Sequence, residues 1–227
     1  MTGTLYIVAT PIGNLNDITL RAIETLKSVD LIACEDTRHA SILLRAHEIR
    51  VPATSYHSYN ERAKGGRILE ELRAGRQVAL ISDAGLPGIS DPGAALMRDA
   101  LAADIPVTVI PGASASLAGL VLSGFPTDRF IFEGFLPVKP GARRSRLEAL
   151  KEEPRTIVLY ESPHRLLKAL TEIREVFGDL PISVSRELTK RFEETRRGPV
   201  SKVLAHFERQ APRGEFVVVL PPARLRR

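Results

Sequence analysis

The chain has 227 residues, 44% of them apolar, which is enough to bury a large core in one large domain or two small ones. It holds no long apolar run and only one cysteine, Cys34, so we expect a cytoplasmic protein without a membrane span, an intrachain disulfide or a cysteine zinc cluster. The net charge of +5 is unevenly divided, because residues 1–138 hold 12 Lys+Arg against 15 Asp+Glu and residues 139–227 hold 20 against 12. A basic second half favours a polyanionic partner such as nucleic acid, with a solvated basic surface as the alternative.

The first half of the chain alternates between short apolar strands and helical patterns. Strands are predicted at residues 5–10, 30–34, 78–82 and 107–110, each rich in β-branched residues and apolar along its whole length. Apolar residues recur at helical spacing between them, at Leu20, Ile23 and Leu26, then at Ile68, Leu69 and Leu72, and then at Leu96 and Ala100. This alternation predicts an α/β fold with a parallel sheet.

The stretch LISDAGLPGISDPG, from Leu80 to Gly93, is longer than an ordinary turn requires. Its first part follows a predicted strand and is rich in glycine. Its second part predicts the start of a helix, with Ser90 or Asp91 as the N-cap and Pro92 in the first turn.

The second half of the chain does not show the same regular alternation of strands and helices. Strands are predicted at residues 130–135, 156–160, 182–185 and 215–220, and a helical stripe is formed by Leu166, Leu167, Leu170, Ile173 and Phe177. Residues 136–146 contain Pro, Gly and Arg and predict a mobile loop, and RAKGGR at residues 62–67 predicts a basic turn. We place a domain boundary near Gly112 and predict an N-terminal α/β domain of residues 1–112 and a C-terminal α/β domain of residues 113–227.

Several familiar site motifs are missing from the sequence. There is no GxxxxGK[ST], no GxGxxG and no HExxH, the five histidines lack metal-ligand spacing, and GASAS at residues 112–116 lacks the second glycine of GxSxG. We therefore expect no metal site. Instead, six polar segments each follow a predicted strand: Thr10–Asn14, Glu35–His39, Ser82–Gly88, Pro111–Ala115, Glu161–Arg165 and Arg186–Arg191. Ligands collect at the carboxyl ends of parallel strands, so these segments predict one cleft, although turn chemistry alone could explain any one of them.

Five segments carry a resemblance to a known family. They are LYIVATPIGNLNDITLRA at residues 5–22, DLIACEDTRH at 30–39, LISDAGLPGISDPG at 80–93, VIPGASA at 109–115 and YESPHR at 160–165. Together they resemble the small-subunit ribosomal RNA (cytidine 2′-O) methyltransferase family of the tetrapyrrole-methylase superfamily. The similarity extends over the whole chain from Leu5 to Leu220.

The resemblance implies two α/β domains with S-adenosylmethionine in the cleft between them, usually as a homodimer. It implies methyl transfer to the ribose 2′-hydroxyl of a cytidine in the decoding region of 16S rRNA, with the 30S subunit as the expected form of the substrate. Family members commonly continue past the last strand with a helical extension, which is absent from this sequence. Two rivals stay open: a superfamily methyltransferase acting on a tetrapyrrole or another small molecule, and a non-catalytic ribosome-assembly protein that binds RNA.

The resemblance also implies which residues hold the cofactor. S-Adenosylmethionine has no phosphate, so glycine-rich loops would serve here to bring backbone groups close to the adenine and the methionine moiety. Similarity to the superfamily pattern assigns this role to Pro11, Gly13, Asp83, Ala84, Gly85, Leu86, Ser114, Ala115, Tyr160, Leu188 and Gly214. Asp83 has the alternative role of a helix cap.

Methyl transfer to a ribose hydroxyl needs an aligned nucleophile and a group that accepts its proton. The candidate catalytic residues lie in the motifs EDTR, ESPHR and RELTK and are Asp36, Arg38, Glu161, Glu187 and Lys190. Neighbouring arginines are expected to lower the pKa of Lys190 and so suit it to proton transfer. As an alternative, Glu35–Arg38 and Glu187–Lys190 are structural ion pairs at i,i+3.

The basic residues of the second half are expected to contact RNA phosphates, which supply affinity and salt dependence rather than sequence choice. They are Arg143, Arg144, Arg146, Arg165, Arg186, Arg191, Arg196 and Arg197. Aromatic residues make up only 5% of the chain, so few bases can be stacked; Tyr56, Tyr59 and Tyr160 are candidate platforms for an unstacked base.

Overall fold

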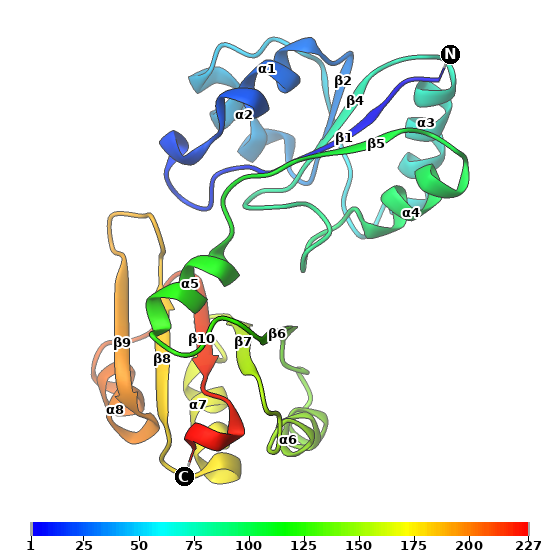
Figure 1. The fold of residues 1–227 in the computed structure, drawn as a ribbon. Coiled ribbons are helices and arrows are strands. Elements are labelled where there is room, and N and C mark those ends of the chain that lie inside the picture. Colours follow the sequence, from blue (N-terminus) through cyan, green and yellow to red (C-terminus); the bar gives the residue numbers. More distant parts are fainter. Residues whose placement is uncertain (1, 227) are drawn as a thin grey trace. The chain divides into compact units, whose positions relative to one another are not determined.

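The computed structural model describes residues 2–226, which divide into two compact units, residues 1–114 (unit 1) and residues 115–227 (unit 2) (Figure 1). Each unit contains one five-stranded sheet with helices packed against it. The division lies two residues after the boundary predicted from the sequence.

Unit 1 contains a fully parallel sheet. Its strands are β1 (Leu5–Val8), β2 (Leu31–Cys34), β3 (Ala53–Ser55), β4 (Val78–Ile81) and β5 (Val107–Ile110), in the order β3-β2-β4-β1-β5. The connections include a 3-10 turn (Leu15–Asp17) and the helices α1 (Leu20–Ser28), α2 (Thr37–Ala46), α3 (Glu61–Arg73) and α4 (Ala94–Ala102). The predicted α/β fold with a parallel sheet is confirmed.

The central strands of this sheet, β1, β2 and β4, are buried on both faces, whereas the edge strands β3 and β5 are partly exposed. On one face, α1 and α2 pack Leu26 and Leu44 against Ile32 of β2, and on the other face, α3 and α4 pack Leu72 and Leu96 against the sheet (Figure 1). Burial on two sides explains why the central strands are apolar along their whole length rather than at alternate positions.

Some local predictions for unit 1 are wrong. The segment RAKGGR lies inside α3 rather than in a turn, and the short edge strand β3 and helix α2 were not predicted. Helix α4 has Gly93 as its N-cap, with φ 129°, instead of Ser90 or Asp91. A Cβ at Gly93 would lie 2.7 Å from Cδ2 of Leu80, so this position needs glycine for both space and conformation.

Unit 2 contains a mixed sheet. Its strands are β6 (Phe130–Phe135), β7 (Thr156–Glu161), β8 (Pro181–Arg186), β9 (Glu194–Pro199) and β10 (Phe216–Leu220), in the order β6-β7-β10-β8-β9, and only β6 and β7 are parallel neighbours. The helices are α5 (Ala115–Ser123), α6 (Pro140–Ala149), α7 (Leu166–Phe177) and α8 (Val200–Arg209), followed by a 3-10 turn (Ala223–Leu225).

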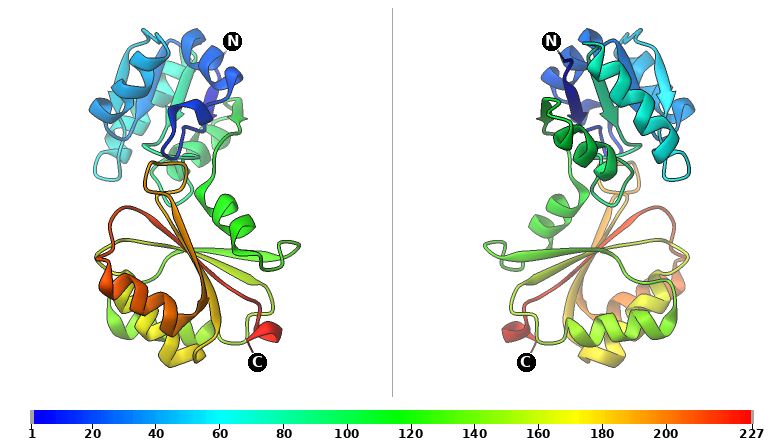
Figure 2. Two further views of the ribbon diagram at one scale, coloured as in Figure 1. Left: turned by 90° about the vertical axis from the view of Figure 1, so that its left-hand side faces the viewer. Right: turned by 90° about the vertical axis from the view of Figure 1, so that its right-hand side faces the viewer.

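The two faces of the unit 2 sheet carry different layers. Helices α6, α7 and α8 cover one face, where Leu147, Leu170 and Phe207 join the core (Figure 2). Helix α5 lies on the other face, where a Cβ at Gly119 would come within 2.6 Å of Cγ1 of Val217. Residues 140–146 belong to α6, so the predicted mobile loop is wrong over that range, and β9 and α8 were not predicted. Among the described residues, no helix is both long enough and apolar enough to cross a membrane.

Candidate functional site

The segments that follow β1 and β4 are joined at the carboxyl edge of the unit 1 sheet. The backbone N–H of Thr10 donates to the carbonyl of Gly85 at 2.8 Å, and the N–H of Gly85 donates back to the carbonyl of Thr10 at 3.1 Å. The hydroxyl of Thr10 also donates to the carbonyl of Ser82 at 3.1 Å. Gly85 has φ +78°, a conformation that L side chains rarely adopt, so the bridge depends on glycine.

The segment that follows β5 approaches the same edge. A Cβ at Gly112 would lie 2.9 Å from the Cβ of Ala9, so glycine permits the close packing of these two backbones. The predicted cofactor residues of unit 1 thus follow three neighbouring strands, β4, β1 and β5. Pro11 and Gly85 are buried there, whereas Gly13 is exposed and Asp83, Ala84, Leu86 and Ser114 are half-buried.

Asp83 links the β4 segment to the start of helix α2. Its Oδ1 accepts a hydrogen bond from the backbone N–H of Asp36 at 3.3 Å and lies 3.4 Å from Nδ1 of His39. These contacts tie two neighbouring loops together, in place of the alternative role of Asp83 as a helix cap. The Asp83 side chain keeps 38% of its surface exposed and so faces solvent at this edge.

Asp36 is the N-cap of α2. Its Oδ1 accepts the backbone N–H of Arg38 at 2.8 Å, and its Oδ2 lies 2.7 Å from Nη2 of Arg38. The hydrogen bonds from Arg38 lower the pKa of Asp36 to about 2. The EDTR ion pair therefore joins Asp36 to Arg38, rather than Glu35 to Arg38 as the alternative interpretation had it.

Glu35 and Cys34 have pKa values shifted in the opposite direction. Burial, followed by the charge of the Asp83 carboxylate, raises the pKa of Glu35. Burial and the same carboxylate raise the pKa of the Cys34 thiol to about 11, so Cys34 is not a thiolate nucleophile at neutral pH. Glu35 is consequently the carboxylate of this edge whose proton affinity is raised.

In unit 2, Tyr160 and Glu161 point to opposite faces of the sheet. The Tyr160 hydroxyl accepts the backbone N–H of Ser116 at the start of α5, at 3.1 Å. Glu161 is 3% exposed on the face covered by α6 and α7, where its Oε1 accepts the N–H of Ser162 at 2.8 Å and lies 3.4 Å from Nε of Arg165. Burial raises the pKa of Glu161. Arg165 in turn donates to the carbonyl of Leu136, so the ESPHR motif fixes the turn between β7 and α7.

The turn after β8 is held by Glu187 and Lys190. Oε1 of Glu187 accepts the Lys190 ammonium at 2.9 Å and the backbone N–H of Glu215 at 3.1 Å, and Leu188 is buried beside them. Gly214 has φ +84°, and a Cβ there would lie 2.2 Å from Oε1 of Glu187. This close contact explains why position 214 is a glycine without reference to any ligand.

The predicted shift for Lys190 has the wrong sign. Partial burial lowers the pKa of Lys190, but its hydrogen bonds to Glu215 and Glu187 outweigh burial and raise the pKa. The ammonium lies 2.8 Å from Oε2 of Glu215, a partner 25 residues away in the sequence. Lys190 is accordingly a charged anchor of the turn, and the alternative Glu187–Lys190 ion pair is confirmed.

Most of the arginines predicted to contact RNA are paired with acids. Arg143 is 4% exposed and makes a bidentate pair with Glu172, at 2.7 and 2.6 Å, so its prediction as a phosphate contact is wrong. Five more pairs exist: Arg144 with Glu175, Arg146 with Glu133, Arg165 with Glu161, and both Arg186 and Arg196 with Glu194. Arg191 and Arg197 have no acidic partner within the described chain. Tyr56 is 1% exposed in the core, so it cannot be a stacking platform.

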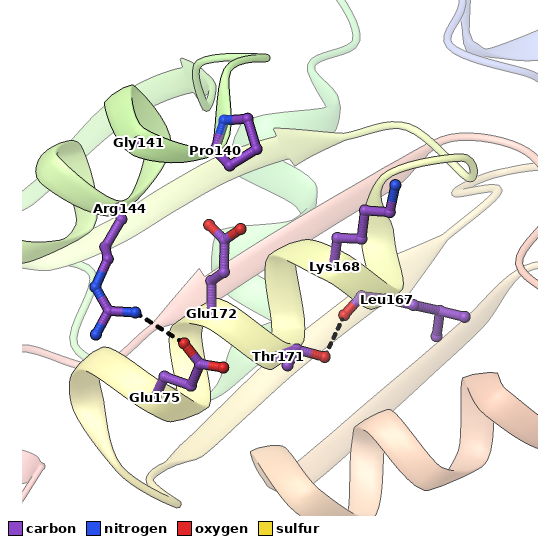
Figure 3. A pocket seen from close by; sticks show the side chains of 8 residues that line it. All are labelled: Pro140, Gly141, Arg144, Leu167, Lys168, Thr171, Glu172 and Glu175. Carbon is purple, nitrogen blue, oxygen red and sulfur yellow. Dashed lines mark hydrogen bonds and ion pairs between the residues drawn. The ribbon is translucent and has the colours of Figure 1, made fainter.

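An open pocket of about 460 Å³ lies between α6 and α7 (Figure 3). Of the predicted site residues, only Arg144 lines it. Several of its polar groups are already bonded within the protein: Arg144 pairs with Glu175 at 2.9 Å, the Thr171 hydroxyl donates to the Leu167 carbonyl at 2.9 Å, and Glu172 accepts hydrogen bonds from Arg143. The carboxyl edge of the unit 1 sheet, which gathers most of the predicted cofactor residues, is the better candidate site.

Comparisons with known proteins identify the family to which the chain is similar. The sequence model of the family Tetrapyrrole (Corrin/Porphyrin) Methylases matches residues 4–204. The chain is 50% identical to Ribosomal RNA small subunit methyltransferase I of Synechocystis, over 97% of this chain and 80% of that relative. It is 48% identical to the protein of the same name from Thermotoga maritima, over 96% of this chain and 98% of that relative. The crystal structure of uroporphyrin-III-C-methyltransferase from Thermus thermophilus is similar with a TM-score of 0.68 and 22% identity, covering 98% of this chain and 96% of that one, which shows a shared fold.

Proposed function

We propose the function of this chain from its family: it belongs to the tetrapyrrole methylases and, within them, to the ribosomal RNA small subunit methyltransferase I family. In this proposal it methylates the ribose 2′-hydroxyl of a cytidine in the decoding region of 16S rRNA, with S-adenosylmethionine as the methyl donor. The observation that carries the proposal is similarity at about half of all positions over nearly the whole chain. The bridged segments at the carboxyl edge of the unit 1 sheet supply the chemistry that such a donor needs.

The residues of this edge fit S-adenosylmethionine. The cofactor has no phosphate, and the edge offers closely packed backbone segments and a half-exposed carboxylate, Asp83, which can accept hydrogen bonds from hydroxyl or ammonium groups. We propose that the cofactor contacts of this edge come from Pro11, Gly13, Asp83, Ala84, Gly85, Leu86 and Ser114. When bound, the cofactor supplies an electrophilic methyl group on a sulfonium.

We propose Glu35, rather than the predicted Asp36, Glu161, Glu187 or Lys190, as the proton acceptor. A carboxylate with a pKa near 2 is a weak base, so we assign Asp36 and Arg38 to positioning of the α2 start. Lys190 is protonated and bonded to two carboxylates, Glu187 among them, and Glu161 is buried beneath α6 and α7. Glu35 lies at the carboxyl end of β2, and its raised pKa makes it the stronger base for a hydroxyl proton.

A methyl-transfer assay tests this function against its rivals. Tritiated S-adenosylmethionine is incubated with the protein and 30S subunits, with protein-free 16S rRNA, or with a porphyrinoid. Label in rRNA, resistant to alkali as a 2′-O-methyl dinucleotide, is the expected result, and we expect 30S subunits to be the better acceptor. Label in the porphyrinoid would replace the proposal with the small-molecule reaction, and no transfer to any acceptor would favour a ribosome-assembly protein. The oligomeric state, for which we propose a homodimer, is measured by sedimentation of the same preparation.

A further inference from the structure

The turn between β8 and β9 holds its side chains in a fixed arrangement. Glu187 and Thr189 have φ values of +50° and +66°, and backbone bonds from Lys190 to Glu187 and from Glu193 to Lys190 close the turn at 3.0 and 3.1 Å. The N–H of Thr189 donates to the Glu193 carboxylate at 2.6 Å. A turn held by this many contacts presents its remaining side chains with little conformational freedom.

Phe192 and Arg191 are the side chains of this turn that project into solvent. Phe192 is 66% exposed, and the guanidinium carbon of Arg191 lies 5.5 Å from the centroid of its ring. A phenyl ring so exposed to water contributes little to the stability of the fold. The Arg191 guanidinium lies over this ring, and no acid in the described chain neutralises its charge. Arg197, on the following strand, is also exposed and donates from Nε to the carbonyl of Leu122 at 2.6 Å rather than to an acid.

The nearby acids are engaged elsewhere. Glu187 and Glu215 hold Lys190, and Glu194 holds Arg186 and Arg196. The turn therefore shows an aromatic ring with one unneutralised cation, Arg191, while Arg197 lies farther along β9, where it pairs in register with Ser183. An unpaired nucleobase next to a phosphate has complementary chemistry, because bases stack on aromatic and guanidinium planes while phosphates pair with arginine.

We propose that Phe192 and Arg191 form a stacking platform for an unpaired base of the rRNA substrate, and that Arg197 contacts a phosphate of the same RNA farther along β9. This proposal rests on the proposed function for its choice of RNA, and it adds a substrate-positioning residue, Phe192, outside the carboxyl edge of unit 1. A second copy of the chain or another protein seated on Phe192 is the competing occupant.

The chain contains no tryptophan, so Phe192→Trp introduces a single fluorescent reporter at the platform. Titration with 30S subunits or with a single-stranded oligoribonucleotide is expected to quench its emission, and the variant is expected to methylate 30S subunits within about twofold of the unchanged protein. Emission that stays constant at RNA concentrations that saturate binding would overturn the proposal. This readout needs no methyl transfer, so it separates failure of the platform from failure of the proposed function.

Phe192→Ala is expected to raise KM for 30S subunits roughly 30-fold, the middle of the range found when a stacked base loses its aromatic partner, with S-adenosylmethionine affinity unchanged. The matched control is Val138→Ala, which shortens another exposed apolar side chain of unit 2 and should leave KM unchanged. Arg197→Ala, which removes the proposed phosphate contact, should reduce the magnitude of the slope of log K against log salt by about 0.7. A change in sedimentation of Phe192→Ala with no change in RNA affinity would assign the residue to a protein interface and overturn the proposal.

Discussion

At the carboxyl edge of the unit 1 sheet, backbone groups such as those of Thr10 and Gly85 bond to one another, and the carboxylates of Asp83 and Glu35 remain at the surface of the fold. In unit 2, which carries the basic half of the chain, six of the eight arginines predicted to contact RNA are bound to acids. The difference shows that a count of charges does not measure the charge available to a partner. Most of the arginines predicted to contact RNA instead hold elements of unit 2 together.

The sharpest test of unit 1 is the removal of its candidate base. Glu35→Gln keeps the shape of the side chain and is expected to lower kcat for 30S methylation by about 10²–10⁴-fold, the usual effect of losing a general base, with little change in the free energy of unfolding. The control is Asp36→Asn, because asparagine caps a helix as well as aspartate and should retain activity within a few-fold. If Asp36→Asn lost activity and Glu35→Gln kept it, the assignment of the two carboxylates would be reversed.

In unit 2, the corresponding test removes one partner of the buried Arg143–Glu172 ion pair. Arg143→Ala leaves Glu172 without its bidentate partner in a largely buried place, and we expect a loss of about 3–5 kcal/mol in the free energy of unfolding. Arg144→Ala, one residue away, breaks a pair whose side chains are both about half exposed and should cost less than about 1 kcal/mol. Urea denaturation of both variants measures the difference. Equal losses of unfolding free energy would mean that burial does not make the Arg143 pair more important for stability than the exposed Arg144 pair.

These contrasts indicate what the sequence could predict. The central strands β1, β2 and β4 of unit 1 are predictable because burial on both faces makes them apolar, and a parallel sheet brings the segments after them to one edge. Strand β9 was missed because ETRRGP is polar and takes its place through contacts such as Arg186–Glu194, which only the fold defines. Helix α6 was missed because Pro140, at its first position, and Gly141 are typical of loops as well as of helix starts.

The side-chain partners within the site were the least predictable part. The lowered pKa predicted for Lys190 assumed that Arg38, Arg165 and Arg186 surround it, but hydrogen bonds from Lys190 to Glu215, far along the chain, and to Glu187 raise its pKa. Glu161 lies next to Tyr160 in sequence, yet the alternation of a strand sends the two to opposite faces. Motifs thus located the loops correctly, while the chemistry of each charged group depended on residues that the motif does not contain.

The pH dependence of stability tests whether burial or ion pairing dominates at Glu161. Burial raises its folded-state pKa above the unfolded value of 4.5, so the native state binds the proton more tightly. The contribution of Glu161 to stability is then present below pH 4.5 and is lost as pH rises through the folded-state pKa. The difference in unfolding free energy between the unchanged protein and Glu161→Gln should fall as pH increases from 4.5. A difference that grows with pH would show that pairing with Arg165 outweighs burial.

The smallest expected effects come from two glycines of unit 1 with opposite roles. Gly85→Ala keeps 3.6 Å between its Cβ and Cγ2 of Ile12 but forces alanine to φ +78°, so we expect a loss of about 1–2 kcal/mol and weaker binding of S-adenosylmethionine at the bridged edge. Gly66→Ala lies in helix α3, where a Cβ meets nothing within 4 Å, and should stabilise the fold by roughly 0.5–1 kcal/mol through helix propensity. Thermal unfolding with and without the cofactor measures both variants. Because Gly66 lies outside the bridged segments, its variant should keep the full stabilisation by cofactor, whereas Gly85→Ala should lose part of it. Equal stabilisation of the two variants by the cofactor would remove the Thr10–Gly85 bridge from the proposed site.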